Sequence, residues 1–393
     1  MADEYGLNGA AQIKVVGVGG GGCNAVDRMI ANGVRGVEYI GMNTDVRALA
    51  KCQAPVRLQL GPITTGGKGA GGKPEVGRAS AEESVEEIAE LLQGADMVFV
   101  VAGMGGGSGT GASPLVAKAA RSVGALTVGN VTLPFSWEGK HRSGLASTGV
   151  EGLRENVDAL IVIPNDRLLA IVEEEIPLLK AFVLADEMLR QGVEGIVGII
   201  DYTADINVDF NDVRETIKGA GSALLSIGVG RGPERARDAA EQAVYSRLLD
   251  RDIRGAKSVL FEVRGDASMS LYELQAAADI ISDLADADAS IIWGGGVDEH
   301  LEDEMQIRLI AAGFDGREPD VIDAAWSSAS AAPVQTKAQR PTWATIDVPG
   351  MSEPATLKQE RPNDGKRSEA EEKPSGLSDF LMQGLRGGEK PGR

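Results

Sequence analysis

The sequence is short of the residues that build disulfide frameworks and metal cages. Among its 393 residues there are two cysteines, Cys23 and Cys52, and two histidines. Their spacing matches neither a zinc motif nor a set of paired disulfides, which is typical of proteins in a reducing cytosol. No uncharged apolar run approaches the roughly 20 residues that cross a bilayer. We therefore predict a cytoplasmic protein with no Cys/His metal cage and no direct insertion into a membrane.

Basic side chains are also scarce relative to acidic ones. Lysine and arginine number 39, against 58 aspartates and glutamates, and the formal net charge is −19. Proteins that bind nucleic acid nonspecifically need clustered positive charge to neutralise the phosphates. The composition therefore predicts no nucleic-acid partner, and a polyanionic ligand would need a local site.

What the chain does contain is a regular alternation of apolar runs and helical patterns. The strand-like runs of the first half are Ile13–Val18, Val37–Met42, Met97–Val101, Leu126–Thr132 and Ala159–Ile163. Amphipathic segments such as Ala81–Gln93 separate them, and this alternation is typical of a parallel sheet covered by helices. A long helix with a broad apolar face is predicted to begin near Pro177, buried between two domains.

A second, smaller α/β region is predicted from about Asn207 to Phe314. Its expected strands span 224–229, 258–263, 291–293 and 307–311, and its expected helices span 234–249 and 271–284. Beyond Gly316, which precedes half of the 16 prolines, the apolar periodicity fades, and this predicts a disordered tail. Near its end, four apolar residues share one helical face, as in a peptide that folds on a partner, although they could also be a leftover apolar cluster. They are Leu377, Phe380, Leu381 and Leu385.

The most distinctive motif is the glycine-rich run Gly103–Gly111, between an apolar strand and a helical pattern that starts near Ala112. Its six glycines and two hydroxyls can present bare backbone N–H groups at a helix N-terminus, where phosphates bind. The alternative is a flexible linker, but linkers of this composition do not usually join a strand to a helix. The run therefore predicts a phosphate-binding loop.

A second glycine loop, Gly17–Gly22, ends the first strand and fits the G-x-G-x-x-G pattern of dinucleotide-binding folds. Two such loops on neighbouring strands favour a nucleoside triphosphate, which has more phosphate charge to surround. A third stretch, Gly67–Pro74, resembles a P-loop but has proline where the magnesium-ligating hydroxyl should be. We interpret it as another glycine-rich loop, which carries Lys68 and Lys73 near the terminal phosphates.

Polar residues end two other strands of the predicted sheet, at Asn43-Thr44-Asp45 and Asn165-Asp166. Ligands bind at this carboxyl edge in open α/β sheets. Asn24 in the first helix and Asp186 on the long helix are candidates for a purine, because a carboxylate accepts the two hydrogens of guanine N1–H and N2–H. The alternative for Asp186 is a solvated helix face.

Together these motifs resemble those of the FtsZ family, the tubulin-like GTPases of prokaryotic cell division. The resemblance covers about Ile13 to Phe314 and rests on six motifs in order: Gly19–Asn24, Asn43–Asp45, Gly103–Gly111, Pro134–Arg142, Asn165–Arg167 and Asn207–Asp212. It implies an α/β fold with a Rossmann-like parallel-sheet GTPase domain, a long central helix, a smaller α/β C-terminal domain and a disordered tail.

One departure is Ser108, where the family usually has threonine. Serine keeps the hydroxyl but loses the methyl group that restricts the side chain, so the turnover rate stays open.

The resemblance implies a site for GTP or GDP, with Mg²⁺ bound through the phosphates rather than by an assigned protein ligand, and K⁺ as a further candidate cation. It assigns the phosphates to Gly20, Gly21, Gly22, Gly107, Ser108 and Gly109, the sugar and phosphate side to Glu138 and Arg142, and guanine to Asn24 and Asp186. The other nucleotide-binding residues expected on these motifs are Cys23, Asn43, Asp45, Ala70, Gly71, Gly105, Gly106, Thr110 and Asn165.

Catalysis is expected to need a second subunit. In that family the loop matching Asn207, Asp209 and Asp212 enters the nucleotide pocket of the next subunit, where its carboxylates orient the attacking water. This suits a reaction that depends on positioning water and neutralising charge. Without the resemblance, Asp209 and Asp212 are more typical of a helix cap.

The implied organisation follows the same pattern. It comprises a flexible N-terminus (1–12), a GTP-binding domain (13–175), a central helix with the start of the catalytic loop (176–206), a C-terminal activating domain (207–315), a disordered linker (316–375) and a partner-binding peptide (376–393). The expected partners are copies of the chain itself in head-to-tail polymers, at a mid-cell division ring, and a membrane-tethering adaptor bound by the tail peptide.

Two other functions stay open on the sequence. A nucleotide-binding scaffold or regulatory paralogue with little hydrolysis is supported by Ser108. A dinucleotide oxidoreductase is supported by Gly17–Gly22 alone.

Overall fold

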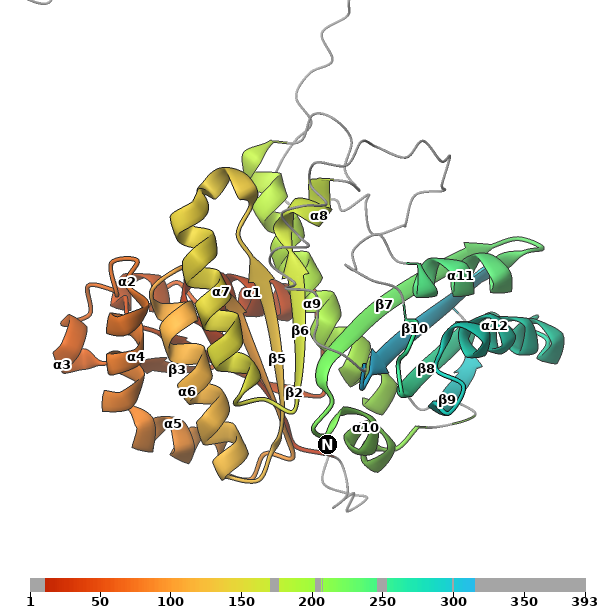
Figure 1. Ribbon diagram of the computed structural model, residues 1–393, viewed down its shortest axis with the longest axis horizontal. Helices are drawn as coiled ribbons and strands as arrows, with labels where there is room; N and C mark the ends of the chain where they lie inside the picture. Colours follow the sequence, from red (N-terminus) through yellow and green to blue (C-terminus); the bar gives the residue numbers. More distant parts are fainter. Residues whose placement is uncertain are drawn as a thin grey trace, which may run out of the picture. The chain divides into compact units, whose positions relative to one another are not determined.

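Ten strands of the chain form one sheet in the order β3-β2-β1-β4-β5-β6-β7-β10-β8-β9 (Figure 1). The computed structural model describes residues 11–169, 177–201, 206, 208–245, 253–298 and 300–314. All of them belong to one unit of the chain, Met1–Ala344. The predicted N-terminal segment before Ala11 and the predicted tail with its apolar peptide lie outside the described residues.

The strands of the first half are all parallel, as the alternating pattern predicted. They are β1 (Ile13–Val18), β2 (Val37–Asn43), β3 (Val56–Gln59), β4 (Met97–Gly103), β5 (Leu126–Leu133) and β6 (Ala159–Pro164). The strands of the second half are β7 (Gly221–Arg231), β8 (Ser258–Gly265), β9 (Ser290–Val297) and β10 (Glu304–Ala312). β7 pairs with β6 in parallel, β10 is antiparallel to β7 and β8, and β9 is parallel to β8.

Helices connect these strands and cover the sheet. In the first half they are α1 (Gly19–Ala31), α2 (Val46–Leu49), α3 (Pro62–Thr65), α4 (Pro74–Glu83), α5 (Val85–Leu92), α6 (Ser108–Ser122), the 3-10 helix η1 (Ser136–Glu138), α7 (Lys140–Arg154) and α8 (Asn165–Leu169). They are followed by α9 (Leu178–Asp201), α10 (Phe210–Ile217), α11 (Arg235–Val244) and α12 (Leu271–Leu284). No helix within the described residues is long and apolar enough to span a membrane.

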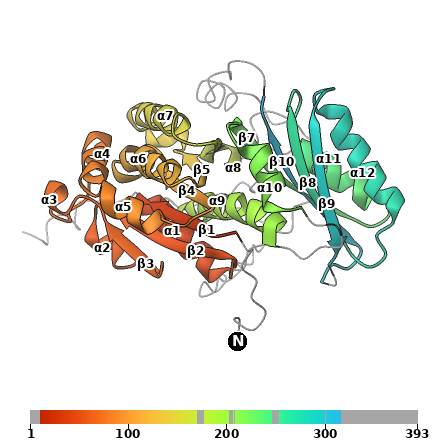
Figure 2. The same cartoon turned by 90° about the horizontal axis from the view of Figure 1, so that it is seen from below.

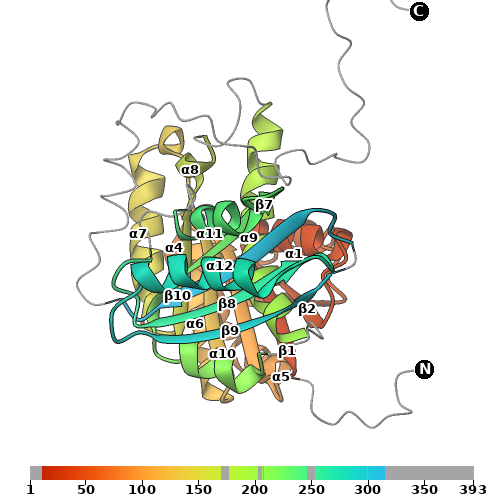
Figure 3. The same cartoon turned by 90° about the vertical axis from the view of Figure 1, so that its right-hand side faces the viewer.

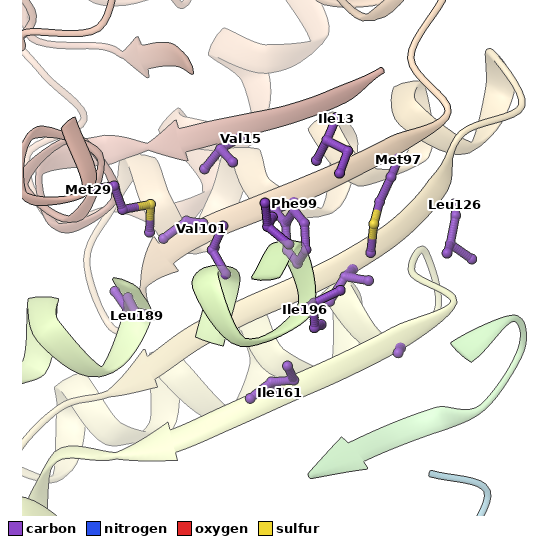
Figure 4. Packing of buried hydrophobic residues seen from close by; sticks show 14 of the residues in the cluster. Ile13, Val15, Met29, Met97, Phe99, Val101, Leu126, Ile161, Leu189 and Ile196 are labelled. Atoms are coloured by element: carbon purple, nitrogen blue, oxygen red, sulfur yellow. The ribbon is translucent and has the colours of Figure 1, made fainter. Parts of the chain in front are cut away.

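The parallel part of the sheet is buried on both faces because its strands alternate between two cores. In β4, Met97, Phe99 and Val101 face the core formed with α1 and α9 (Figure 4). The intervening Val98 and Val100 face the core formed with α5, α6 and α7 on the other side (Figure 2). Such strands are near-continuous apolar runs, which is why composition alone located them.

The helix α9 separates the parallel strands from the second half of the chain. On one side the Asn130 side chain of β5 donates to the Leu189 carbonyl at 2.8 Å, where Gly192 leaves room for it. On the other side Arg264 of β8 donates to the Gly198 carbonyl at 3.0 Å, and a Cβ at Gly198 would lie 2.7 Å from the guanidinium of Arg308. The broad apolar face predicted for this helix is buried at Leu189, Val193 and Val197, whereas Leu179 and Phe182 near its start are exposed.

The C-terminal strands carry α11 and α12, which lie side by side (Figure 3). β7 and α11 approach closely because Gly228 and Gly230 have no side chain. A Cβ at Gly228 would overlap the carbonyl oxygen of Ala239, and one at Gly230 would overlap that of Arg235. Alanines of α11 pack in the core with Val259 and Phe261 of β8.

Two predicted helices differ from the structure, and one strand was missed. The helix expected at Ala81–Gln93 is two helices, α4 and α5, because Ser84 between them is buried and its hydroxyl accepts a hydrogen bond from Gly61 N at 3.1 Å. The short edge strand β3 was not predicted. The helix expected at 234–249 ends at Val244, and its last four residues lie outside the described part of the chain.

We expect Gly228→Ala to destabilise the protein by about 2 kcal/mol, because the added methyl meets helix backbone that cannot rotate away. Gly144→Ala is the matched control: nothing lies within 4 Å of its added Cβ, and alanine in a helix interior gains up to about 1 kcal/mol over glycine. Urea unfolding followed by circular dichroism measures both. Equal stabilities of Gly228→Ala and the wild type would contradict the close approach of α11.

Candidate functional site

Two helix N-termini, those of α1 and α6, meet at the carboxyl edge of the parallel sheet. They follow the adjacent strands β1 and β4. A Cβ at Gly19, whose φ is +72°, would lie 2.7 Å from Gly109 N, and one at Gly21 would lie 3.2 Å from Gly103 N. The two glycine loops therefore touch backbone to backbone. Neither helix has a side-chain cap among the described residues, so its first N–H groups stay available to an anion.

The glycine run begins its helix earlier than predicted, at Ser108 rather than near Ala112. Gly105, at φ +92°, donates its N–H to the Thr110 hydroxyl at 2.8 Å, so Thr110 fixes the shape of the loop. A Cβ at Gly106 would meet nothing within 4 Å, which leaves this stretch of backbone open.

The third glycine-rich loop lies against the second. A Cβ at Gly107 would come within 2.8 Å of the Ala70 Cβ and 2.9 Å of Lys73 N. Gly71 and Gly72 have φ of +59° and +75° with open space around them. Pro74 is the first residue of α4, as expected for a proline at a helix start.

The segment Asn43-Thr44-Asp45 joins β2 to the same place. Asp45 accepts the backbone N–H of Arg47 at 2.8 Å as the N-cap of α2, which holds the pKa of this carboxyl below its usual value. The Thr44 hydroxyl lies 2.6 Å from the Ser108 hydroxyl. The buried amide nitrogen of Asn43 has no hydrogen-bond partner among the described residues, so a ligand atom could accept a hydrogen bond from it.

A turn around η1 holds Glu138 and Arg142. One carboxylate oxygen of Glu138 accepts Phe135 N at 2.8 Å, and the other lies 2.9 Å from the Arg142 guanidinium. Arg142 remains half exposed, so it can reach a ligand, while Glu138 is largely buried. Asp166, at the start of α8, accepts the N–H of Ser136 at 3.0 Å and ties this turn to the end of β6.

The candidate purine pair lies on helices that pack together, α1 and α9. Asn24 is exposed on α1. Burial raises the pKa of Asp186 to about 7, the positive charge of Arg28 opposes that rise, and the negative charge of Asp27 adds to it. Asp186 is thus half-buried rather than fully solvated, and its raised pKa means that it takes up a proton more readily than an ordinary aspartate.

Two of the predicted nucleotide-binding residues, Cys23 and Asn165, have buried side chains. Cys23 is 3% exposed, and its thiol faces the carbonyls of Gly17 and Met42. A hydrogen bond with Cys52 and burial both raise the pKa of this thiol, so it stays protonated and only its backbone can meet a ligand. Asn165 is buried at the end of β6, and its side-chain oxygen has no partner among the described residues.

The two predicted catalytic carboxylates lie far from these loops. Asp209 accepts the N–H groups of Asn211 and Asp212 at 2.8 and 3.0 Å, and Asp209 N donates to Asp212 at 3.1 Å. They are thus the capping box of α10, as their spacing predicted. Arg214 on this helix donates to the carbonyl of Gly124, just before β5, so α10 lies at the amino ends of the strands (Figure 1). Asn207 lies outside the described residues.

The comparisons with known proteins agree with this architecture. Residues 12–173 match the Tubulin/FtsZ family GTPase domain, and residues 221–315 match the FtsZ family C-terminal domain. An empty FtsZ dimer from M. jannaschii is 42% identical, over 77% of this chain and 88% of that chain, with a TM-score of 0.72. An FtsZ point mutant from the same organism is 41% identical, over 79% and 93%, with a TM-score of 0.74. This chain belongs to the FtsZ family.

A more distant likeness shows the shared fold alone. CetZ2 from Haloferax volcanii, described as a GTPγS-bound protofilament, is 21% identical over 81% of this chain and 98% of that chain, with a TM-score of 0.67. The chain thus has the FtsZ-family GTPase fold, and the family implies binding of GTP or GDP. Among the described residues, no group of three or more His, Cys, Asp or Glu side chains could hold a metal ion.

Two residues that lie near the candidate purine pair were not predicted from the sequence. Phe182 is 38% exposed and lies one helical turn before Asp186, where a ring could stack on a base. It packs edge-on against Phe135 and Trp137, whose rings stack at 5.5 Å. The spacing from Asp186 could have indicated Phe182. Arg28 follows Asn24 by one turn, but only the packing of α1 on α9 brings its charge near Asp186.

We expect Asp186→Asn to stabilise the nucleotide-free protein while weakening GTP binding. The folded pKa of about 7 exceeds the usual 3.8, so the folded state binds the proton more tightly and wild-type stability falls as pH rises through this range. The gain should grow from about pH 4 to pH 7, reach roughly 4 kcal/mol and then level off. Urea titrations at several pH values measure it. Glu90→Gln, at an exposed carboxylate of α5, is the control, and a pH-independent difference would contradict the burial of Asp186.

Proposed function

We propose that this chain is a GTP-hydrolysing protein that assembles head to tail into filaments of the cell-division ring, each active site being shared by two adjacent subunits. The free helix N-termini of α1 and α6 bind the phosphates. Asn24, Asp186 and Phe182 bind guanine, while Glu138 and Arg142 lie toward the sugar and phosphates.

One observation carries this proposal: the acidic pair and the glycine loops occupy opposite ends of α9. With 24 residues, this helix is about 36 Å long. Asp209 and Asp212 follow its C-terminal end, whereas Asp186 lies in its N-terminal half. The glycine run adjoins Pro134 and Arg142 at Gly105, and the neighbouring Phe135 packs on Phe182 near the start of α9. One chain cannot bring the two sets together. Stacking subunits head to tail places the α10 start of one chain at the loops of the next.

The chemistry fits carboxylates delivered in this way. Triphosphate hydrolysis depends on orienting a water and stabilising the charge on the phosphoryl group, without a covalent nucleophile. The capping box fixes the Asp209 and Asp212 carboxylates before assembly, so little ordering is left for the contact itself. Mg²⁺ would enter with the phosphate oxygens and neutralise their charge, and K⁺ is a second candidate cation.

The similar structures support assembly for their own proteins: one is described as an FtsZ dimer and another as a CetZ2 protofilament with GTPγS. We extend this to a cytoplasmic polymer at mid-cell. The tail residues Leu377, Phe380, Leu381 and Leu385 would bind an adaptor that tethers the polymer to the membrane.

GTP turnover per subunit should depend on protein concentration, because a monomer has only half of the site. We expect almost no phosphate release below a threshold concentration and a rise in proportion to the excess subunits above it. Phosphate release and light scattering, measured over the same dilution series, test this. Constant turnover per subunit at all concentrations would show that one chain holds a complete site.

Asp212→Asn should separate catalysis from capping. The amide oxygen can still accept Asp209 N, so the start of α10 and GTP-dependent assembly should survive, while turnover falls about 100-fold with loss of the charge. Glu215→Gln removes one charge from the exposed side of the same helix and should leave turnover near that of the wild type. Wild-type turnover in Asp212→Asn filaments would overturn the shared-site mechanism.

A nucleotide-binding scaffold with little hydrolysis is the second candidate, because Ser108 lacks the methyl group usual in the family. The same assays distinguish it. A scaffold would assemble with GTP and release almost no phosphate at any concentration. Its phosphate release would be the same in the wild type and in Asp212→Asn.

A further inference from the structure

Thr44 lies beneath the phosphate loops in a fixed position. It is fully buried between β2 and α2. Its carbonyl accepts the hydroxyl of Thr65 at 3.2 Å and the N–H of Gly69 at 3.1 Å. Thr65 and Gly69 therefore hold its backbone in place, and its complete burial leaves the side chain little freedom to move.

The Thr44 hydroxyl has one hydrogen-bond partner within the described residues, Ser108 Oγ at 2.6 Å. Either hydroxyl could donate on geometry alone. Thr44 has no access to water, and a buried hydroxyl hydrogen left without an acceptor is costly. Ser108 is partly exposed and can donate elsewhere. The favoured arrangement is thus Thr44 as donor and Ser108 as acceptor.

This direction leaves the hydrogen of Ser108 free at the N-terminus of α6. A phosphate oxygen is a pure acceptor, so Ser108 can bind it only as a donor. A serine hydroxyl samples three rotamers, whereas the second branch of threonine restricts χ1. The hydrogen bond from Thr44 can supply the restriction that the missing methyl group does not.

We propose that Thr44 is a positioning residue for the GTP site: its hydroxyl orients Ser108 toward a nucleotide phosphate and compensates for serine at that position. The inference rests on the proposed function, because it requires a phosphate at the start of α6. It concerns a buried side chain that would not itself touch the ligand.

The test is a double-mutant cycle on GTP affinity and turnover in the full-length protein. Thr44→Val keeps the shape of the side chain and removes the donor, so we expect about fivefold weaker GTP binding. In a Ser108→Ala background the same change should have no further effect. Combined with Ser108→Thr, it should recover most of the wild-type affinity, because threonine restricts its own rotamer.

Thr65→Val is the matched control, since Thr65 contacts the Thr44 backbone and not Ser108. Its effect should add to that of Ser108→Ala. If valine at position 44 prevents folding, Thr44→Ser against Thr44→Ala compares hydroxyl and no hydroxyl in smaller side chains, and only serine should keep wild-type affinity.

Additive losses in Thr44→Val with Ser108→Ala, or no rescue by Ser108→Thr, would reduce Thr44 to a structural residue and overturn this inference alone. Wild-type protein that binds no GTP in the same titration would overturn the proposed function as well. Loss of coupling together with normal wild-type binding and threshold-dependent turnover would leave the shared GTPase site intact.

Discussion

Backbone contact between two helix starts is the constraint on which the rest of the site depends. The loops before α1 and α6 touch at Gly19 and Gly109, where no Cβ could fit, and neither helix start has a side-chain cap among the described residues. Two sets of N–H groups therefore point to one place, and no side chain in the described part of the chain caps them. The third glycine loop and the end of β2 then pack around this contact, through Gly107 with Ala70 and through Thr44 with Ser108.

Asp186, the candidate guanine-binding residue, lowers the stability of the folded protein. Asp186 is held where burial raises its pKa to about 7, with Arg28 as a partial counter-charge. A carboxylate retained at such a cost is typical of a functional position. The helix that carries it is held on both sides by polar contacts, from Asn130 and from Arg264, so α9 can tolerate an unfavourable residue.

Beyond the C-terminal end of α9, Asp209 and Asp212 cap a helix and are also the proposed catalytic carboxylates. Asp209 and Asp212 cap α10 by accepting and exchanging backbone hydrogen bonds. The cap leaves room for the proposed catalytic role, because it uses one oxygen of each carboxylate and orients the other. Under the proposed function, a second copy of the chain would bring these carboxylates to the nucleotide.

Local patterns in the sequence determined the parallel strands, the glycine loops and α12, because burial on two faces and helical spacing are recorded residue by residue. The sequence also argued against a P-loop at Gly67–Pro74, since Pro74 has no hydroxyl to bind magnesium. Only the tertiary structure decided the break at Ser84, the inward thiol of Cys23, the edge-on packing of Phe182 against Phe135 and Trp137, and the pairing of Thr44 with Ser108. Each depends on a contact between residues distant along the chain or on the face that a side chain occupies. Periodicity reports how deeply a residue is buried, but not which atom it meets there.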